Sequence, residues 1–74
     1  RMNTVSEQID YLVRLYSERY RGTPKRVVLN VEDYTTLAQE LRVDLLYEDL
    51  EYYGNLIVDV DENLDDDESP KLTK

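Results

Sequence analysis

Residues 25–41, KRVVLNVEDYTTLAQEL, change from the pattern of a strand to the pattern of a helix around one asparagine. Residues 26–31 form a short run that is rich in β-branched side chains, which predicts a strand. Asn30 is a preferred N-cap residue, and Asp33 follows three residues later as its capping partner. A helix over about 31–42 is then predicted by an apolar stripe at helical spacing, formed by Tyr34, Leu37, Ala38 and Leu41.

An amphipathic helix precedes this unit. Thr4 and Glu7 have the spacing of a capping box, and Gly22 and Pro24 are typical of the end of a helix. The sequence therefore predicts a helix over about 4–20, with a left-handed glycine after it. Its apolar residues recur at helical spacing and are Val5, Ile9, Leu12, Val13, Tyr16 and Tyr20.

Two further segments complete the expected domain. Residues 56–60 alternate between faces and follow a turn signal at 53–55, so they predict a strand. Residues 43–53 fit an extended segment and a short helix equally well. We expect one α+β domain over residues 1–63, with an N-terminal helix, a strand–helix–strand unit and a two- or three-stranded sheet. Residues 64–74 have no periodic apolar pattern and predict a flexible acidic tail.

The charge of the chain is divided unevenly along the sequence. The 74 residues have a net charge of −8, with no histidine and no cysteine. Residues 1–31 contain six basic and three acidic residues, whereas residues 32–68 contain fourteen acidic residues and Arg42 alone. The second part, at net −13, would repel nucleic acid and anionic membranes and attract a basic protein surface. The arginines of the first part are expected to pair with the acidic part, within the chain or across a dimer.

The acidic residues of the second part are the candidate binding site. They are spread over the predicted helix, the segment that follows it, the last strand and the start of the tail. We expect them to form one extended surface for a partner, composed of Glu32, Asp33, Glu40, Asp44, Glu48, Asp49, Glu51, Asp59, Asp61, Glu62 and Asp65.

Residues 59–70 do not fit a calcium loop, although acidic or amide residues alternate from Asp59 to Asp67. An EF-hand loop needs glycine at its sixth position and glutamate at its twelfth, and here these positions are Leu64 and Pro70. The absence of histidine, of cysteine and of a phosphate-binding glycine loop also argues against an enzyme. We therefore predict no cofactor, no metal and no catalytic residue.

The small size of the chain indicates that it pairs with a second copy of itself. A domain this small and without disulfides buries a limited core, so we expect a homodimer, with sheet edges available for pairing.

There are seven tyrosines and no other aromatic residue. Tyr47, Tyr52 and Tyr53 are interleaved with the acids Glu48, Asp49 and Glu51, and tyrosine is enriched at interfaces. A Tyr/Leu surface over residues 45–53 is thus an alternative site, in an adaptor or assembly protein. No apolar run is long enough to predict a membrane span or signal peptide.

The whole chain also resembles a known group of proteins. The segments TVSEQIDYLVRLYSERY, KRVVLNVEDYTTLAQEL and LIVDVDENLDDDE together resemble the short acidic host-takeover proteins of bacteriophages. Among these, they are most similar to the Bacillus-phage DNA mimics that inhibit the bacterial nucleoid protein HU. The resemblance implies a homodimer in the host cytoplasm whose carboxylates occupy the DNA-binding site of HU. A second likeness, of PKRVVLNVEDYTTL and YYGNLIVDVDE to phage capsid-type proteins, would imply a virion assembly accessory.

Overall fold

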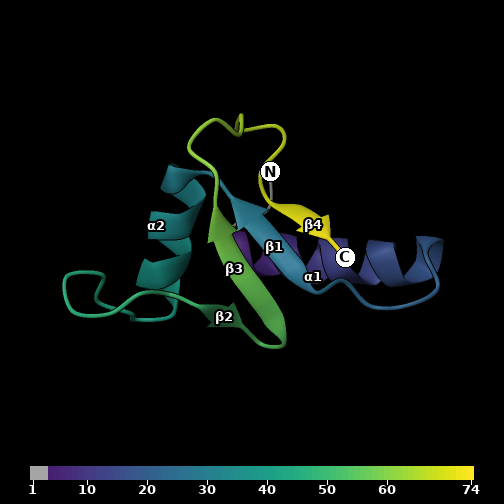
Figure 1. Cartoon of the computed structure of the whole chain (residues 1–74), viewed down its shortest axis with the longest axis horizontal. Helices are drawn as coiled ribbons and strands as arrows, with labels where there is room; N and C mark the ends of the chain where they lie inside the picture. The colour runs from purple at the N-terminus through teal and green to yellow at the C-terminus, as the bar shows by residue number, and fades with distance from the viewer. Residues whose placement is uncertain (1–3) are drawn as a thin grey trace.

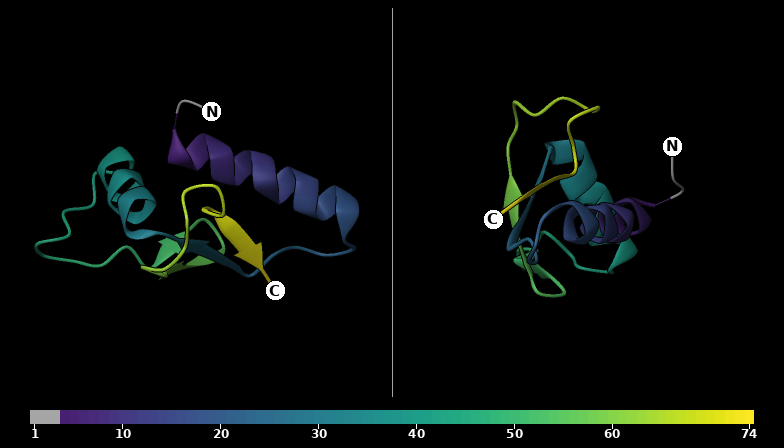
Figure 2. Two further views of the ribbon diagram at one scale, coloured as in Figure 1. Left: turned by 90° about the horizontal axis from the view of Figure 1, so that it is seen from above. Right: turned by 90° about the vertical axis from the view of Figure 1, so that its right-hand side faces the viewer.

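The computed structural model of the protein describes residues 4–74. Within these residues the chain forms two helices, α1 (Val5–Arg19) and α2 (Val31–Glu40). It also forms four strands, namely β1 (Arg26–Leu29), β2 (Tyr52–Tyr53), β3 (Leu56–Val60) and β4 (Lys71–Thr73). Both helices pack on one face of a mixed sheet and leave its other face open (Figures 1 and 2). The α+β class and the N-terminal helix are therefore confirmed.

The centre of the sheet is a parallel pair joined by α2. The strand order is β2-β3-β1-β4, with β1 parallel to β3 and Val27 opposite Val58. A parallel pair needs a crossover connection, and α2 provides it. The predicted sheet of two or three strands has four, because two very short strands, β2 and β4, pair antiparallel at the edges. Gly54, with φ of 58°, makes the turn between β2 and β3 possible.

The C-terminal end of the chain corrects the predicted domain boundary. Residues 64–74 are predicted to be a flexible tail, but β4 pairs with β1 and places Leu72 opposite Val27. Ser69 and Pro70 are buried, and Leu72 packs against the core. The domain therefore extends to β4. The prediction fails because a three-residue strand is too short to show a periodic pattern. Residues 1–3 of the predicted domain lie outside the described residues.

Both helices begin as predicted but end earlier. The Thr4 hydroxyl accepts a hydrogen bond from the Glu7 amide at 3.0 Å, and the Asn30 side chain accepts one from the Asp33 amide at 2.8 Å. However, α1 ends at Arg19, and Tyr20 is already extended. Gly22 has φ of 134°, which is positive but outside the left-handed helical region, so its predicted role as a helix cap is wrong.

The core lies between the helices and the sheet. It consists of buried side chains from both helices, the two central strands and the segment before β2, namely Val5, Ile9, Val27, Leu29, Leu37, Ala38, Leu50, Leu56 and Val58. Leu41 and Val60 continue the predicted stripes but are exposed: α2 ends at Glu40, and Val60 is the last residue of β3, opposite Leu29 at the end of β1. Residues 43–51 form turns without a regular helix or strand, which settles the open alternative.

Candidate interaction surface

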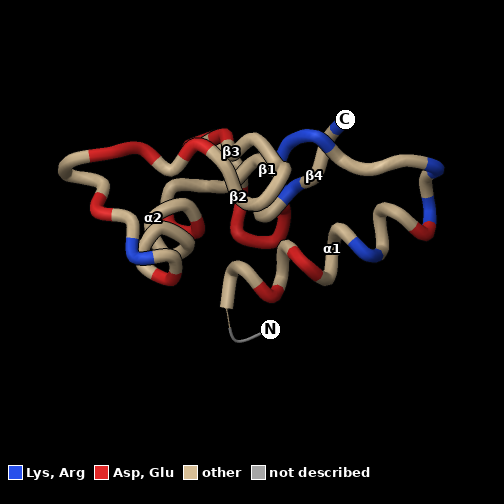
Figure 3. The backbone as a smooth tube through the Cα atoms, turned by 90° about the horizontal axis from the view of Figure 1, so that it is seen from below, with Lys and Arg blue, Asp and Glu red and all other residues tan. Residues whose placement is uncertain are grey.

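Charged side chains separate along the length of the molecule. The domain measures 38 Å along its long axis and 23 Å along the other two. Acidic residues gather over α2, the segment before β2 and the loop between β3 and β4, whereas basic residues gather at the end of α1, the α1–β1 connection and β4 (Figure 3). We call residues 44–51 the first acidic segment and residues 61–68 the second acidic segment. They contain four and six acidic residues and no basic residue.

Hydrogen bonds hold the first acidic segment against the end of α2. The Val43 amide donates to the carbonyl of Ala38 at 2.9 Å, and the Leu50 amide donates to the Tyr34 hydroxyl at 3.0 Å. Leu50 itself is buried in the core. The segment is therefore attached at both ends, and the charged residues between these points face solvent.

A small polar network ties the second acidic segment to the start of α2. The Ser69 hydroxyl donates to the Asp33 carboxylate at 2.7 Å and accepts from the Asn30 amide at 3.0 Å. The Asn30 side-chain amide donates to the Asp66 carboxylate at 3.0 Å. Since α2 has ten residues and rises about 1.5 Å per residue, its two ends lie about 15 Å apart. One acidic segment is thus fixed at each end of this helix (Figure 1).

Asp33 is not part of the exposed surface. It is predicted to be a partner-binding residue, but only 3% of it is exposed, and its carboxylate belongs to the network with Ser69. An acid three residues after an N-cap points back toward the capping residue, and here the chain from Ser69 covers it. The prediction for Asp33 is therefore corrected to a structural role.

Glu40 is also used by the fold. Its two carboxylate oxygens accept from the amides of Val5 and Ser6 at 2.8 and 2.9 Å, so it caps the start of α1 from the end of α2. Partial burial alone would raise the pKa of Glu40, but the hydrogen bonds from Ser6 and Val5 outweigh this effect and hold the pKa below its ordinary value. Its predicted place in the binding surface is corrected to a contact between helices.

Asp59 lies on the open face of the sheet, where it forms an ion pair with Arg26 of the neighbouring strand β1. Both side chains are partly exposed, so the pair is a surface interaction that lowers the charge Asp59 offers to a partner. The sequence predicts that the N-terminal arginines pair with acids of the second part, and among residues 4–74 Arg26 forms such a pair.

The other predicted acids are exposed, and they fall into the two segments and the first turn of α2. They are Glu32, Asp44, Glu48, Asp49, Glu51, Asp61, Glu62 and Asp65. The carboxylates of Asp44 and Asp61 accept from backbone amides two residues later, which shapes their turns. Three further exposed acids follow Asp65 in the predicted tail and are not among the predicted site residues, namely Asp66, Asp67 and Glu68.

The acidic segments provide weak grounds for a metal site. Carboxylate oxygens of Asp65, Asp67 and Glu68 lie within 4.8 Å of one another, but all three residues are exposed on one turn. Calcium sites take six to eight oxygen ligands, usually including backbone carbonyls from a closely wrapped loop. Three solvated carboxylates on one turn are ordinary for an acidic surface.

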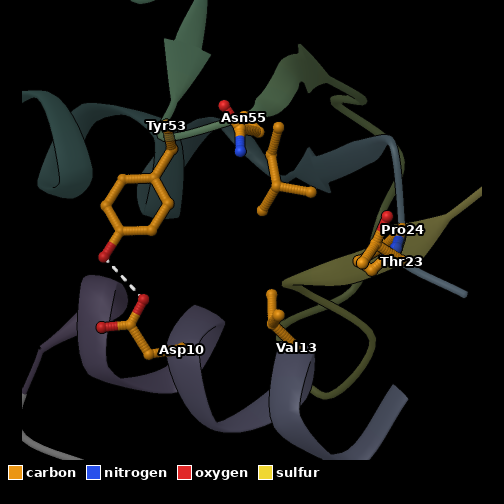
Figure 4. A pocket seen from close by; sticks show the side chains of 7 residues that line it. Asp10, Val13, Thr23, Pro24, Tyr53 and Asn55 are labelled. Carbon is orange, nitrogen blue, oxygen red and sulfur yellow. Dashed lines mark hydrogen bonds between the residues drawn. The ribbon is translucent and has the colours of Figure 1, made fainter. Parts of the chain in front are cut away.

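A hollow of about 330 Å³ lies between α1 and the β2–β3 turn. The Tyr53 hydroxyl donates to the Asp10 carboxylate at 2.8 Å across one side of it, and Val13 and Leu56 form an apolar wall (Figure 4). Burial and the hydrogen bond to Asp10 raise the pKa of Tyr53 to about 12. The phenol therefore stays protonated at neutral pH, so it cannot act as a base there. The bond attaches the β2–β3 turn to α1.

Exposed apolar residues accompany the first acidic segment. Leu46 and Tyr47 are 87% and 86% exposed, and Tyr52 is 62% exposed at the start of β2. By contrast, Leu45 packs partly against the core and Tyr53 turns toward α1. The predicted Tyr/Leu surface over residues 45–53 is therefore smaller than expected and is centred on Leu46 and Tyr47.

Comparison of the chain with protein-family models, curated proteins and solved structures finds no match. The resemblance to phage host-takeover proteins thus stays a prediction. Neither helix of residues 4–74 has the length and apolar character needed to cross a membrane.

Proposed function

We propose that the protein inhibits a basic host DNA-binding protein by imitating the charge of DNA, and that the nucleoid protein HU is the first partner to test. The observation behind the proposal is that two acidic segments are fixed at opposite ends of α2, without a basic residue in either. In the described part of the chain, Arg26–Asp59 is the one acid–base pair within hydrogen-bonding distance, and it lies outside both segments. Their charge is therefore available to a partner.

The spacing of the segments supports imitation of a duplex. The ends of α2 are about 15 Å apart, and the major groove of B-DNA, with a phosphate chain on each side, is about 12 Å wide. Cationic side chains that contact phosphates on both sides of a groove could reach both segments at once.

Attachment to the core also favours tight binding. A hydrogen bond from the Leu50 amide to Tyr34 and one from Asn30 to Asp66 hold the two segments, so their carboxylates lose less conformational entropy on binding than those of a free tail. This is why we include the second segment, from Asp61 to Glu68, in the proposed surface.

The proposal includes the setting implied by the sequence. The protein acts in the cytoplasm of a phage-infected bacterium, as a binding protein without enzymatic activity. We also propose a homodimer through the open face of the sheet, where Val28, Ile57 and Tyr52 provide apolar contact. Sedimentation equilibrium tests this: Ile57→Glu should shift a dimer to monomer, and a monomeric wild-type protein would contradict it.

A competition experiment tests the function. A fluorescent duplex bound to HU should be released as the protein is added at constant low salt. The affinity of the protein for HU, measured directly without DNA, should fall steeply as salt rises, because ionic contacts between exposed groups are screened. A pull-down from bacterial lysate at low and high salt, read by mass spectrometry, would identify other basic partners. A ternary complex of protein, HU and DNA, or binding that is insensitive to salt, would contradict the proposal.

The exposed Leu46 and Tyr47 favour a second candidate, an adaptor or virion assembly accessory that binds through apolar contacts. Aromatic anchors dominate many protein interfaces, and such binding depends little on salt. In this case Tyr47→Ala or Tyr52→Ala should weaken partner binding far more than Glu48→Gln. The reverse order would support the DNA mimic.

A further inference from the structure

The end of the molecule opposite the first acidic segment contains a second surface feature. A cleft of about 560 Å³ opens at the end of α1, between the α1–β1 connection and the C-terminal strand. This volume lies in the range of small-ligand pockets, about 300–1,000 Å³. Four basic side chains and two aromatic rings contribute to its lining, namely Arg19, Arg21, Lys25, Lys74, Tyr16 and Tyr20.

The basic side chains of the cleft have no acidic partner among residues 4–74. The nearest acid along α1, Glu18, is exposed and is not part of the lining. The first acidic segment lies at the other end of a 38 Å molecule, and the second lies over its middle (Figure 3). Because the Debye length at physiological salt is about 8 Å, the charge of the first segment hardly reaches this cleft. An anion can therefore bind here although the protein as a whole is acidic.

The aromatic residues of the cleft add a flat apolar surface. The rings of Tyr16 and Tyr20 lie 4.8 Å apart, and the Arg19 guanidinium lies 5.9 Å from the centre of the Tyr20 ring. Tyr20 is still 48% exposed. A planar ring could stack on Tyr20, as bases stack on aromatic side chains in nucleic-acid-binding proteins. Guanidinium groups match phosphate oxygens through paired hydrogen bonds, and lysines add point charges.

We propose that this cleft binds a ligand that joins several phosphate groups to a planar ring, that is, a nucleoside polyphosphate. Its phosphates contact Arg21, Lys25 and Lys74, and its ring stacks on Tyr20. This site is separate from the acidic surface and does not depend on the proposed inhibition of a DNA-binding protein. It also differs from a nucleic-acid site, since the cleft holds one small ligand and the rest of the surface repels a polyanion.

The test is an NMR titration of the whole chain with adenosine triphosphate, inorganic triphosphate and adenosine, without divalent cations so that residues 65–68 cannot contribute through a metal. Adenosine triphosphate should shift amide signals of residues 16–25 and 71–74. The double variant Arg21→Glu/Lys25→Glu should weaken its binding by about tenfold or more. Arg42→Glu, which reverses the charge of an exposed arginine beyond the end of α2, should leave its affinity unchanged.

A second variant separates the two parts of the ligand. Tyr20→Ala should weaken binding of adenosine triphosphate by about fivefold or more, and leave binding of inorganic triphosphate unchanged. The proposal is overturned if adenosine triphosphate causes no shift, if Arg42→Glu weakens binding as much as the double variant, or if inorganic triphosphate binds as tightly as adenosine triphosphate. It is also overturned if amides of residues 16–25 shift with protein concentration alone in the Ile57→Glu variant, which lacks the proposed dimer contact, because the cleft would then receive the acidic end of a second copy.

Discussion

The acids of α2 and the acids of the two acidic segments have different roles: two of the three in α2 are bound by the fold, and those of the segments are exposed. Of the three acids in α2, Asp33 accepts from a buried hydroxyl and Glu40 accepts from two amides of α1, while Glu32 is exposed. The segments hold ten acids whose hydrogen bonds are to nearby turns or, for Asp66, to the N-cap of α2. Carboxylates next to unpaired donors stabilise the fold, and carboxylates without such donors stay available for binding.

This difference shows what a count of charges leaves out. Residues 32–68 hold fourteen acids and one basic residue in the sequence, yet these acids include both structural and surface carboxylates. A carboxylate is structural where hydrogen-bond donors lie next to it. Donors such as the Ser69 hydroxyl and the first amides of α1 come from distant parts of the chain. Substitutions of single acids should therefore differ in their effect on stability, from a large loss at buried Asp33 to almost none at exposed positions.

Asp33→Ala should destabilise the protein most. The change removes the acceptor of the Ser69 hydroxyl in a buried site, so we expect a loss of about 2–3 kcal/mol in the free energy of unfolding. Urea denaturation measures it, with Glu32→Ala on the same turn of α2 as the exposed control. Equal effects of the two substitutions would show that burial does not distinguish these acids.

Glu40→Gln should have an intermediate effect. It removes a charged cap of α1, and because Glu40 is partly exposed we expect a loss of about 1 kcal/mol. The folded pKa of Glu40 lies below the ordinary 4.5, so its contribution is complete above the unfolded pKa and is lost as pH falls through the folded pKa. Denaturation curves of both proteins should therefore converge as the pH is lowered below about 4.5. A constant difference across this window would contradict the assigned role.

Asp59→Asn should change stability little. The ion pair with Arg26 is partly exposed on the open sheet face, and such pairs contribute about 0–1 kcal/mol. The loss should shrink in high salt, which screens the pair. A large loss in the free energy of unfolding that persists in high salt would contradict this and would mean that Asp59 is a structural acid like Asp33.

Neutralising the turn of the second segment should have the smallest effect. The triple variant Asp65→Asn/Asp67→Asn/Glu68→Gln removes like charges from exposed positions, so Tm should change by no more than about 3 °C, and a small rise is expected. Thermal unfolding followed by circular dichroism measures this. A large fall in Tm would mean that these acids are part of the fold.

Local signals in the sequence were sufficient for most of the secondary structure. The caps at Thr4 and Asn30 and the alternation of residues 56–60 depend on neighbours within a few residues, and all three are found in the structure. The edge strands were not predictable in this way. Strand β4 has three residues and forms because β1 offers an unpaired edge, which is a property of the assembled sheet.

The candidate site was predictable only in part for the same reason. The exposure of Glu48, Asp49 and Glu51 follows from their charge, because unpaired carboxylates are rarely buried. The burial of Asp33 requires Ser69 to fold over it, and the capping role of Glu40 requires α1 and α2 to meet. Such contacts join residues more than thirty positions apart, and no local pattern in the sequence encodes them.

The most direct test of the proposed function is the affinity for HU of a variant in which six surface acids are neutralised, three in each segment. The variant combines Glu48→Gln, Asp49→Asn, Glu51→Gln, Glu62→Gln, Asp65→Asn and Asp67→Asn. At about 0.5 kcal/mol for each exposed ionic contact, its affinity should fall by about a hundredfold. Glu18→Gln, at the opposite end of the molecule, should bind like the wild type. Wild-type affinity in the six-acid variant, with its fold intact by circular dichroism, would contradict binding through the acidic segments.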